Sequence, residues 1–142
     1  MEIKEINRFS VKVFDAVLRL LPQLASGSGS IPDERFRKIL KTEGTHLFIA
    51  EHENKIVGML TLVIYDIPTA TRAWIEDVVV DESQRGLGFG MELINFAIEF
   101  ARSSGAKAVD LTSRPSRITA NRLYQKTGFA IRETNVYRYD LK

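Results

Sequence analysis

The chain has 142 residues, 44% of them hydrophobic and 27% charged, with a formal net charge of +2. These values are typical of a globular domain with a proper core and exclude the disordered, collagen-like and membrane-spanning classes, while the scattered basic residues argue against a nucleic-acid partner. There is no cysteine, which excludes disulfides, thiolate nucleophiles and cysteine-based metal sites.

The N-terminal part predicts one strand and two helices. Residues 1–7 have the pattern of a short strand, and the three-and-four spacing of apolar residues after it predicts a helix that ends at Pro22. A second helix is expected from Pro32, where acidic residues follow the proline, to near Gly44. Between the helices, the serine and glycine residues 26–30 predict a mobile loop of the kind that often borders binding sites.

Three strands are expected next. They cover residues 46–51, 56 to about 65, and 72–80. The first two are joined by the polar turn 53–55, which is short enough for an antiparallel hairpin.

The second half of the chain changes period twice. Apolar residues at helical spacing predict a helix over 88–103, and Gly105 is well placed to stop it. A short buried strand is expected at 108–112, followed by a helix over about 116–127 that Gly128 closes.

Two further strands, at about 129–132 and 135–141, are expected to finish the chain. We therefore predict a single α/β (α+β) domain over residues 1–142, with the element order β α α β β β α β α β β. No internal repeat and no further low-complexity segment interrupts this order.

The most informative stretch connects the strand expected at 72–80 to the helix expected at 88–103. Its glycines at 86, 88 and 90 allow backbone conformations closed to other residues and leave no Cβ in the way, so that successive N–H groups can converge on an anion. The helix that follows adds its free N–H groups and the positive end of its dipole. A diphosphate is the natural ligand, although a plain tight turn would also use glycines here.

Two other phosphate loops fit this stretch poorly. A Walker A loop needs Lys and then Ser or Thr after its last glycine, whereas Met91 and Glu92 follow Gly90. The dinucleotide fingerprint needs Gly or Ala where this chain has Met91. It also needs a βαβ unit at the start of a parallel sheet, whereas three expected strands precede the strand that leads into this turn.

The segment 85–90 resembles the acetyl-CoA signature of the GNAT-type N-acetyltransferases, which is Gln or Arg, any two residues, Gly, any residue, and Gly or Ala. The resemblance continues into 121–124 and 128–129, which look like the second cofactor motif of that family, and into the order of the elements. It implies a GNAT acyl-CoA N-acyltransferase fold, with a central mixed, mostly antiparallel sheet of six to seven strands and about four helices. It also implies acetyl-CoA as co-substrate and an amine as acceptor.

The same resemblance implies a set of cofactor-binding residues. The backbone of the strand before the turn would pair with the pantetheine arm as an added strand, the sheet would splay after this strand to admit the thioester, and amides of 85–91 would hold the diphosphate. Asn121 would hydrogen-bond the pantetheine, unless it only caps a helix. The expected set is Val78, Val79, Val80, Arg85, Gly86, Leu87, Gly88, Phe89, Gly90, Met91 and Asn121.

Acetyl transfer needs a neutral amine, a polarised carbonyl and a proton for the departing thiolate. Tyr124 matches the tyrosine that protonates the CoA sulfur in the family, although a core aromatic residue would fit its spacing as well. Glu76 lies in a mostly apolar strand, so we expect it to face a cavity where partial burial makes it a stronger base. An ion pair or a solvated position is its alternative, and Asp77 is the second candidate.

Other features set the wider expectations. No signal peptide or run of roughly 18 apolar residues is present, so we expect a cytoplasmic protein without a membrane partner. His46 and His52 lack the spacing of paired ligands, so we expect no metal site. Arg114 and Arg117, near the start of the last helix, are expected to be solvated, with contact to a phosphate as the alternative. The C-terminal strands are available for a homodimer.

The sequence leaves the substrate open. The amine acceptor could be a small molecule, an amino acid or a protein amine, and the acyl group could be longer than acetyl. A non-catalytic acyl-CoA sensor is the main alternative to an enzyme.

Overall fold

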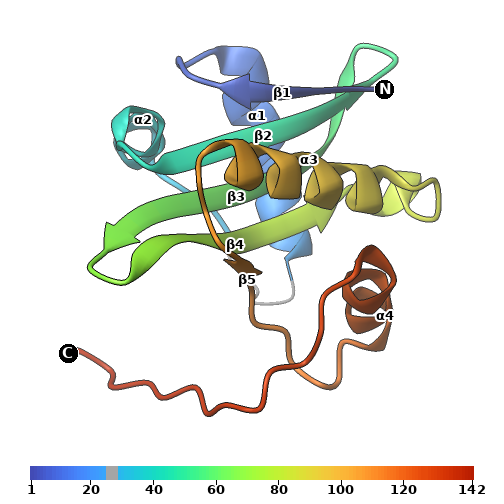
Figure 1. Ribbon diagram of the computed structural model, residues 1–142. Helices are drawn as coiled ribbons and strands as arrows, with labels where there is room; N and C mark the ends of the chain where they lie inside the picture. Colours follow the sequence, from blue (N-terminus) through green and yellow to red (C-terminus); the bar gives the residue numbers. More distant parts are fainter. Residues whose placement is uncertain (25–28) are drawn as a thin grey trace. The chain divides into compact units, whose positions relative to one another are not determined.

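The computed structural model describes residues 1–24 and 29–142, so most of the expected serine-glycine loop lies outside the described residues (Figure 1). Contacts divide the chain into two compact units, Met1–Thr112 and Ser113–Lys142, and the expectation of a single domain stays a prediction. The elements of the first unit are β1 (Glu2–Ile6), α1 (Val11–Leu20), the 3₁₀ helix η1 (Leu21–Gln23), α2 (Asp33–Lys41), β2 (Thr45–His52), β3 (Lys55–Ile67), β4 (Ala70–Val80), the 3₁₀ helix η2 (Glu82–Gln84), α3 (Phe89–Ser103) and β5 (Val109–Asp110). The second unit contains α4 (Ile118–Thr127).

The first unit is built on one sheet with the strand order β1-β2-β3-β4-β5. The first four strands pair antiparallel with their neighbours, and β5 joins β4 in parallel. The expected mixed, mostly antiparallel sheet with about four helices is therefore confirmed, with five strands in the described residues in place of six to seven.

The two last expected strands, at 129–132 and 135–141, were wrong. Residues 129–142 form no strand, and several of their large side chains are exposed, as at Ile131, Val136 and Tyr137. Within the second unit α4 is the one regular element, so this unit itself supplies no strand for these residues to pair with. A single strand or isolated hairpin without further partners is at best marginally stable.

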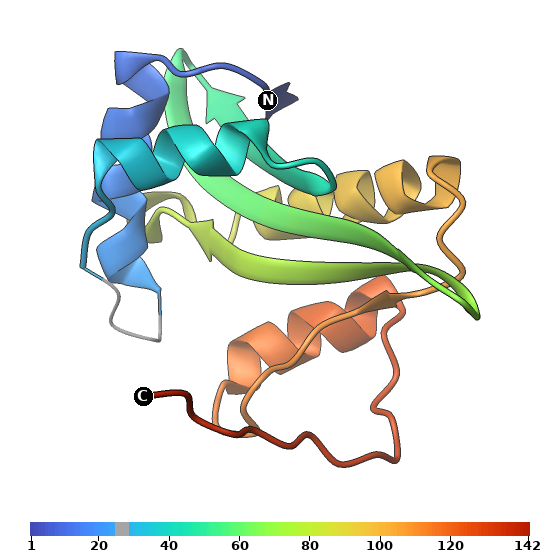
Figure 2. The same cartoon turned by 90° about the vertical axis from the view of Figure 1, so that its left-hand side faces the viewer.

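Helices cover both faces of the sheet in the first unit. Figure 2 shows α1 and α2 against one face and α3 against the other. The core under α1 and α2 combines apolar residues of both helices and of β2, β3 and β4: Val13, Ala16, Val17, Leu20, Leu21, Phe36, Leu47, Ile49, Ile56, Met59 and Val79.

Local signals explain where α1 begins and ends. Ser10 has an extended backbone and its Oγ accepts a hydrogen bond from the Val13 N–H at 3.2 Å, as an N-cap residue does. The α-helix ends at Leu20, where the chain tightens into η1 with Pro22. The expected end of this helix at Pro22 agrees with the structure.

On the other face, α3 packs closely against the sheet. Its inner residues Leu93, Ile94 and Ala97 are fully buried, and Phe48 of β2 contacts the rings of α3 residues. Gly58 of β3 allows this approach, because a Cβ on Gly58 would lie 3.0 Å from Leu93 Cδ1 and 3.2 Å from the Val79 carbonyl oxygen.

Candidate functional site

The chain leaves β4 through a short, well-fixed turn. Asp81 caps η2: its Oδ1 accepts hydrogen bonds from the Ser83 N–H at 3.1 Å and from the Ser83 hydroxyl at 3.0 Å. The Asp81 carbonyl also accepts from the Gln84 N–H at 2.8 Å. The residues before the glycines therefore have a defined conformation.

Gly86 and Gly88 both have left-handed backbone conformations, with φ of 81° and 87°. Residues with a Cβ rarely adopt this region, which explains glycine at both positions. Gly88 is the N-cap of α3, and among the described residues no side-chain cap hydrogen bond forms at this helix start. The N–H groups of its first turn also have no acceptor within the helix, so the turn directs unpaired donors and a positive helix end to one place.

The side chains around this turn are compatible with an anion. Between 85 and 91 the only charged residue is Arg85, and residues 85–88 are exposed. Phe89 is buried, and its ring centroid lies 5.2 Å from that of His52 at the end of β2. This contact anchors the first turn of α3 to the sheet.

One edge of β4 is open beside the turn. β5 pairs with β4 only at Ala73 and Trp74, so in the described part of the chain the rest of this edge has no partner strand. The Asp81 N–H donates to the Val57 carbonyl of β3 at 2.7 Å. Because backbone groups alternate along a strand, those of Val80 and Val78 face the opposite, open edge. The Val80 carbonyl accepts from Arg85 Nε at 3.2 Å.

A bulge shapes β4 in front of this edge. Met59 pairs with Val79, but Thr61 pairs with Glu76, so β4 contains one extra residue at this point. Asp77 within the bulge has φ of 50°, a left-handed conformation that Asp tolerates better than most residues. The alternation that would place Asp77 on the face opposite Glu76 is therefore interrupted.

The expected burial of Glu76 was wrong. Its side chain is exposed, as is that of Asp77. Glu76 pairs with Thr61, on the α1 and α2 face, where the core includes Met59 and Val79 but neither member of this pair. The Glu76 carboxylate is thus exposed and not partly buried as expected, and its role as a base stays a prediction.

The second unit brings Asn121 and Tyr124 onto neighbouring positions of α4, three residues apart, which places them near one face of the helix. Asn121 Nδ2 donates to the carbonyls of Arg114 and Arg117, at 2.8 Å each. The side-chain amide therefore joins the residues before α4 to the helix, but it donates to carbonyls and does not cap the free N–H groups of the helix start. Its contact with pantetheine stays a prediction.

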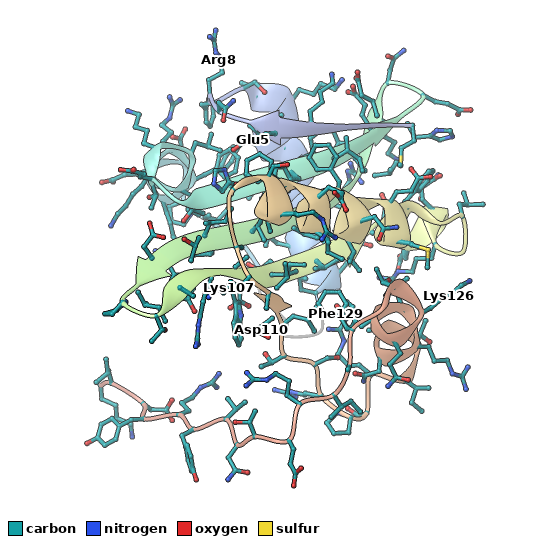
Figure 3. All side chains as sticks on the ribbon, in the orientation of Figure 1. Glu5, Arg8, Lys107, Asp110, Lys126 and Phe129 are labelled. Carbon is teal, nitrogen blue, oxygen red and sulfur yellow. The ribbon has the colours of Figure 1, made fainter. Side chains whose placement is uncertain are left out.

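Tyr124 is buried, and burial raises the pKa of its hydroxyl above the ordinary value of 10.0, while the charge of Arg117 acts in the opposite direction. A proton donor must carry its proton at neutral pH, and this shift favours that form. The Phe129 N–H donates to the Tyr124 carbonyl at 2.9 Å, and the two rings lie 6.0 Å apart. Phe129, labelled in Figure 3, thus closes α4 together with Gly128.

The sequence did not indicate several supporting residues. Arg19 of α1 and Gln23 of η1 contact the residues that begin the turn, and Arg117 acts on Tyr124. The contacts at the start of the turn had one signal in the sequence, which is the charged Asp81 directly after an apolar strand. Its partner Arg19 is 62 positions away and could not be found from local pattern.

Among the described residues, no helix has the length and apolar character needed to cross a bilayer. The same part of the chain holds no group of three or more His, Asp or Glu side chains arranged for a metal ion.

Comparison with known proteins decides the family. A model of the Acetyltransferase (GNAT) family matches residues 15–129, well over half of the chain. The chain belongs to the GNAT acetyltransferase family. Acetyl transfer to an amine is the general reaction of GNAT members, and the family uses acetyl-CoA. The resemblance carried by the glycine turn and by α4 is thereby confirmed.

Individual relatives agree with the family assignment. The chain is 32% identical over 95 residues to human N-acetyltransferase 8, a match that covers 66% of the chain and 42% of that protein. It is 38% identical over 102 residues to the glucosamine 6-phosphate N-acetyltransferase of Trypanosoma brucei brucei, covering 68% of the chain and 65% of that protein. The chain thus spans less than two thirds of the length of either curated relative.

A solved structure confirms the GNAT fold. It is an aminoglycoside acetyltransferase from an uncultured soil metagenomic sample, in complex with sisomicin. The TM-score is 0.88 at 27% identity, and the match covers 99% of this chain and 96% of that one.

Proposed function

We propose that this GNAT chain is an N-acetyltransferase that moves the acetyl group of acetyl-CoA to a primary amine by direct attack in a ternary complex. The observation that carries the proposal is the turn after β4, where two left-handed glycines lead into an uncapped helix end next to an open strand edge. This combination suits a ligand with a diphosphate and an extended amide-containing arm.

The backbone is proposed to hold the co-substrate. Amides of residues 85–91 bind the diphosphate, with Arg85 as the one charged residue among them. The open edge at Val78 and Val80 pairs with the amides of the pantetheine arm. When that happens, Arg85 can leave the Val80 carbonyl, which it covers in this structure, and reach the diphosphate.

Two side chains are proposed to move protons. Glu76 takes a proton from the ammonium form of the acceptor, directly or through water, so that the neutral nitrogen can attack the thioester carbon. A C–N bond forms, the C–S bond breaks, and Tyr124 gives its proton to the departing sulfur. The attacking nitrogen releases its extra proton to water, and Tyr124 regains a proton from water. The chain has no cysteine, so no cysteinyl acyl-enzyme forms in this route.

The acceptor is proposed only as a class. The relative from Trypanosoma brucei brucei is named for an amino sugar phosphate and the metagenomic structure for aminoglycosides, so amines on sugars are the first acceptors to try. The exposed carboxylates of Glu76 and Asp77 beside the open edge suit a cationic amine.

The experiment measures release of free CoA from acetyl-CoA with a panel of amines, for the wild type and for Tyr124→Phe. The variant keeps the ring and loses the acidic hydroxyl, so we expect turnover to fall by about a hundredfold with little change in affinity for acetyl-CoA. Tyr137→Phe, at an exposed tyrosine, is the control and should turn over at the wild-type rate.

Two results would contradict the proposal. Wild-type protein that binds acetyl-CoA but acetylates none of the amines would favour a sensor. Tyr124→Phe with full turnover would remove Tyr124 from the mechanism and leave the rest of the proposal standing.

A further inference from the structure

A buried carboxylate stands at the start of the turn. Among the described residues, Asp81 is the one buried residue that is polar or charged, with 6% of its surface exposed. A buried charge is unfavourable unless it is paired and hydrogen-bonded. The residues that pair with the Asp81 carboxylate therefore indicate its role.

Arg19 of α1 is the charged partner of Asp81. Its Nη1 donates to Asp81 Oδ2, and its Nη2 donates to the Ile56 carbonyl of β3 at 2.6 Å. The planar guanidinium thus holds the end of β4 and the start of β3 at the same time, a geometry that a lysine cannot reproduce with one ammonium group.

Gln23 makes a second contact with the same turn. Its Oε1 accepts a hydrogen bond from the Glu82 N–H at 2.8 Å. Two consecutive turn residues, Asp81 and Glu82, are therefore held by side chains from α1 and η1. Between Glu82 and Gly86 lie only Ser83, Gln84 and Arg85.

We propose that Arg19 and Gln23 are positioning residues for the acyl-CoA: by fixing Asp81 and Glu82, they hold the glycine turn in the conformation that binds the diphosphate. The inference rests on the proposed function, because it needs acetyl-CoA as the ligand of the turn. Arg19 acts through the Asp81 carboxylate and Gln23 through the Glu82 N–H. The hydrogen bonds of Asp81 with Ser83 and Gln84 carry the constraint toward the glycines.

A purely structural role would give a different result. If the Arg19 contacts only stabilised the fold, their loss would affect every substrate in proportion to the loss of folded protein. If they position the turn, their loss weakens only those ligands that carry a diphosphate. Acetyl-pantetheine has the thioester and the arm but no diphosphate, and separates the two cases.

The test compares acetyl-CoA with acetyl-pantetheine for Arg19→Met in the full chain. We expect KM for acetyl-CoA to rise by about tenfold with a smaller change in kcat, while kcat/KM for acetyl-pantetheine stays at the wild-type value. Arg19→Lys should recover part of the affinity for acetyl-CoA. Gln23→Ala removes one hydrogen bond, and its KM should rise by about threefold.

Lys12→Met is the matched control. Lys12 also lies on α1 and also makes an ion pair with the sheet, to Glu51 at 2.6 Å, but away from the turn. Its loss should leave KM for both substrates unchanged.

Equal losses for acetyl-CoA and acetyl-pantetheine in Arg19→Met, or no loss for either, would overturn the inference. Should that variant fail to fold, Gln23→Ala decides by the same comparison. Wild-type protein that does not use acetyl-CoA at all would instead contradict the proposed function.

Discussion

Asp81 shows how one residue serves both stability and the candidate site. The Ser83 N–H lowers the pKa of this carboxyl below its ordinary value of 3.8, the Ser83 hydroxyl and the charges of Arg19 and Lys55 add to this effect, and burial opposes it. A carboxyl with a lowered pKa in the folded state stabilises the protein above its ordinary pKa. This contribution is lost as the pH falls through the folded-state pKa.

The resulting prediction concerns Asp81→Asn. At neutral pH this variant should have a lower free energy of unfolding than the wild type, because Arg19 loses its charged partner. Since the wild-type carboxylate is protonated in acid, the difference should shrink as the pH falls below about 3.8. Urea unfolding at neutral pH and at a series of acid pH values measures it.

The control for this titration is Asp140→Asn, at an exposed carboxylate in the C-terminal residues. It should unfold like the wild type at every pH. A difference between Asp81→Asn and the wild type that stays constant down to the lowest pH would show that the Asp81 charge makes no such contribution.

At the scale of elements, Gly58 of β3 allows α3 to pack closely against the sheet. Replacing Gly58 by Val would place a branched side chain against the buried Leu93 and the backbone of Val79. We expect the free energy of unfolding to fall by about 2 kcal/mol, measured by urea denaturation. Gly29→Val adds the same side chain where no atom of residues 1–24 or 31–142 lies within 4 Å of the new Cβ, and should be nearly neutral. Equal stability of both variants would contradict this packing.

The sequence predicted helices well, because their signals are local. The apolar spacing of α1 and α3 and the left-handed Gly128 after α4 lie within or next to the elements they define. The strands predicted at 129–132 and 135–141 are absent, because a strand also needs a partner far away in the sequence. Alternation shows that residues such as Val136 can form a strand, but not that a neighbouring edge is available.

The candidate site shows the same division. The glycine turn was predictable, since Gly86 and Gly88 have a backbone requirement that only a few residues meet. The exposure of Glu76 was not, because the bulge beside it arises from the register between β3 and β4. The contact between Arg19 and Asp81 joins residues far apart in the sequence and appears only once the sheet has formed.

At the scale of the whole molecule, the family of the chain is established and its acceptor substrate is not. The GNAT model matches residues 15–129, from within α1 to the residue after Gly128. The curated relatives are longer, and the match covers 42% of one and 65% of the other. The family therefore follows from the comparison, while the acceptor has to be found by experiment.

The central claim is that the backbone of residues 85–91 forms a site for the diphosphate of CoA. Calorimetric titration of acetyl-CoA into the wild type, Gly88→Val and Gly105→Val tests it most directly. Both glycines have a left-handed φ with no atom within 4 Å of an added Cβ, so the two variants introduce the same backbone strain, and only Gly88 lies in the turn.

We expect the wild type and Gly105→Val to bind acetyl-CoA alike and Gly88→Val to bind at least about tenfold more weakly, since the strained residue displaces the amides of the turn. No heat of binding with well-folded wild type, or equal affinity in all three proteins, would contradict the account.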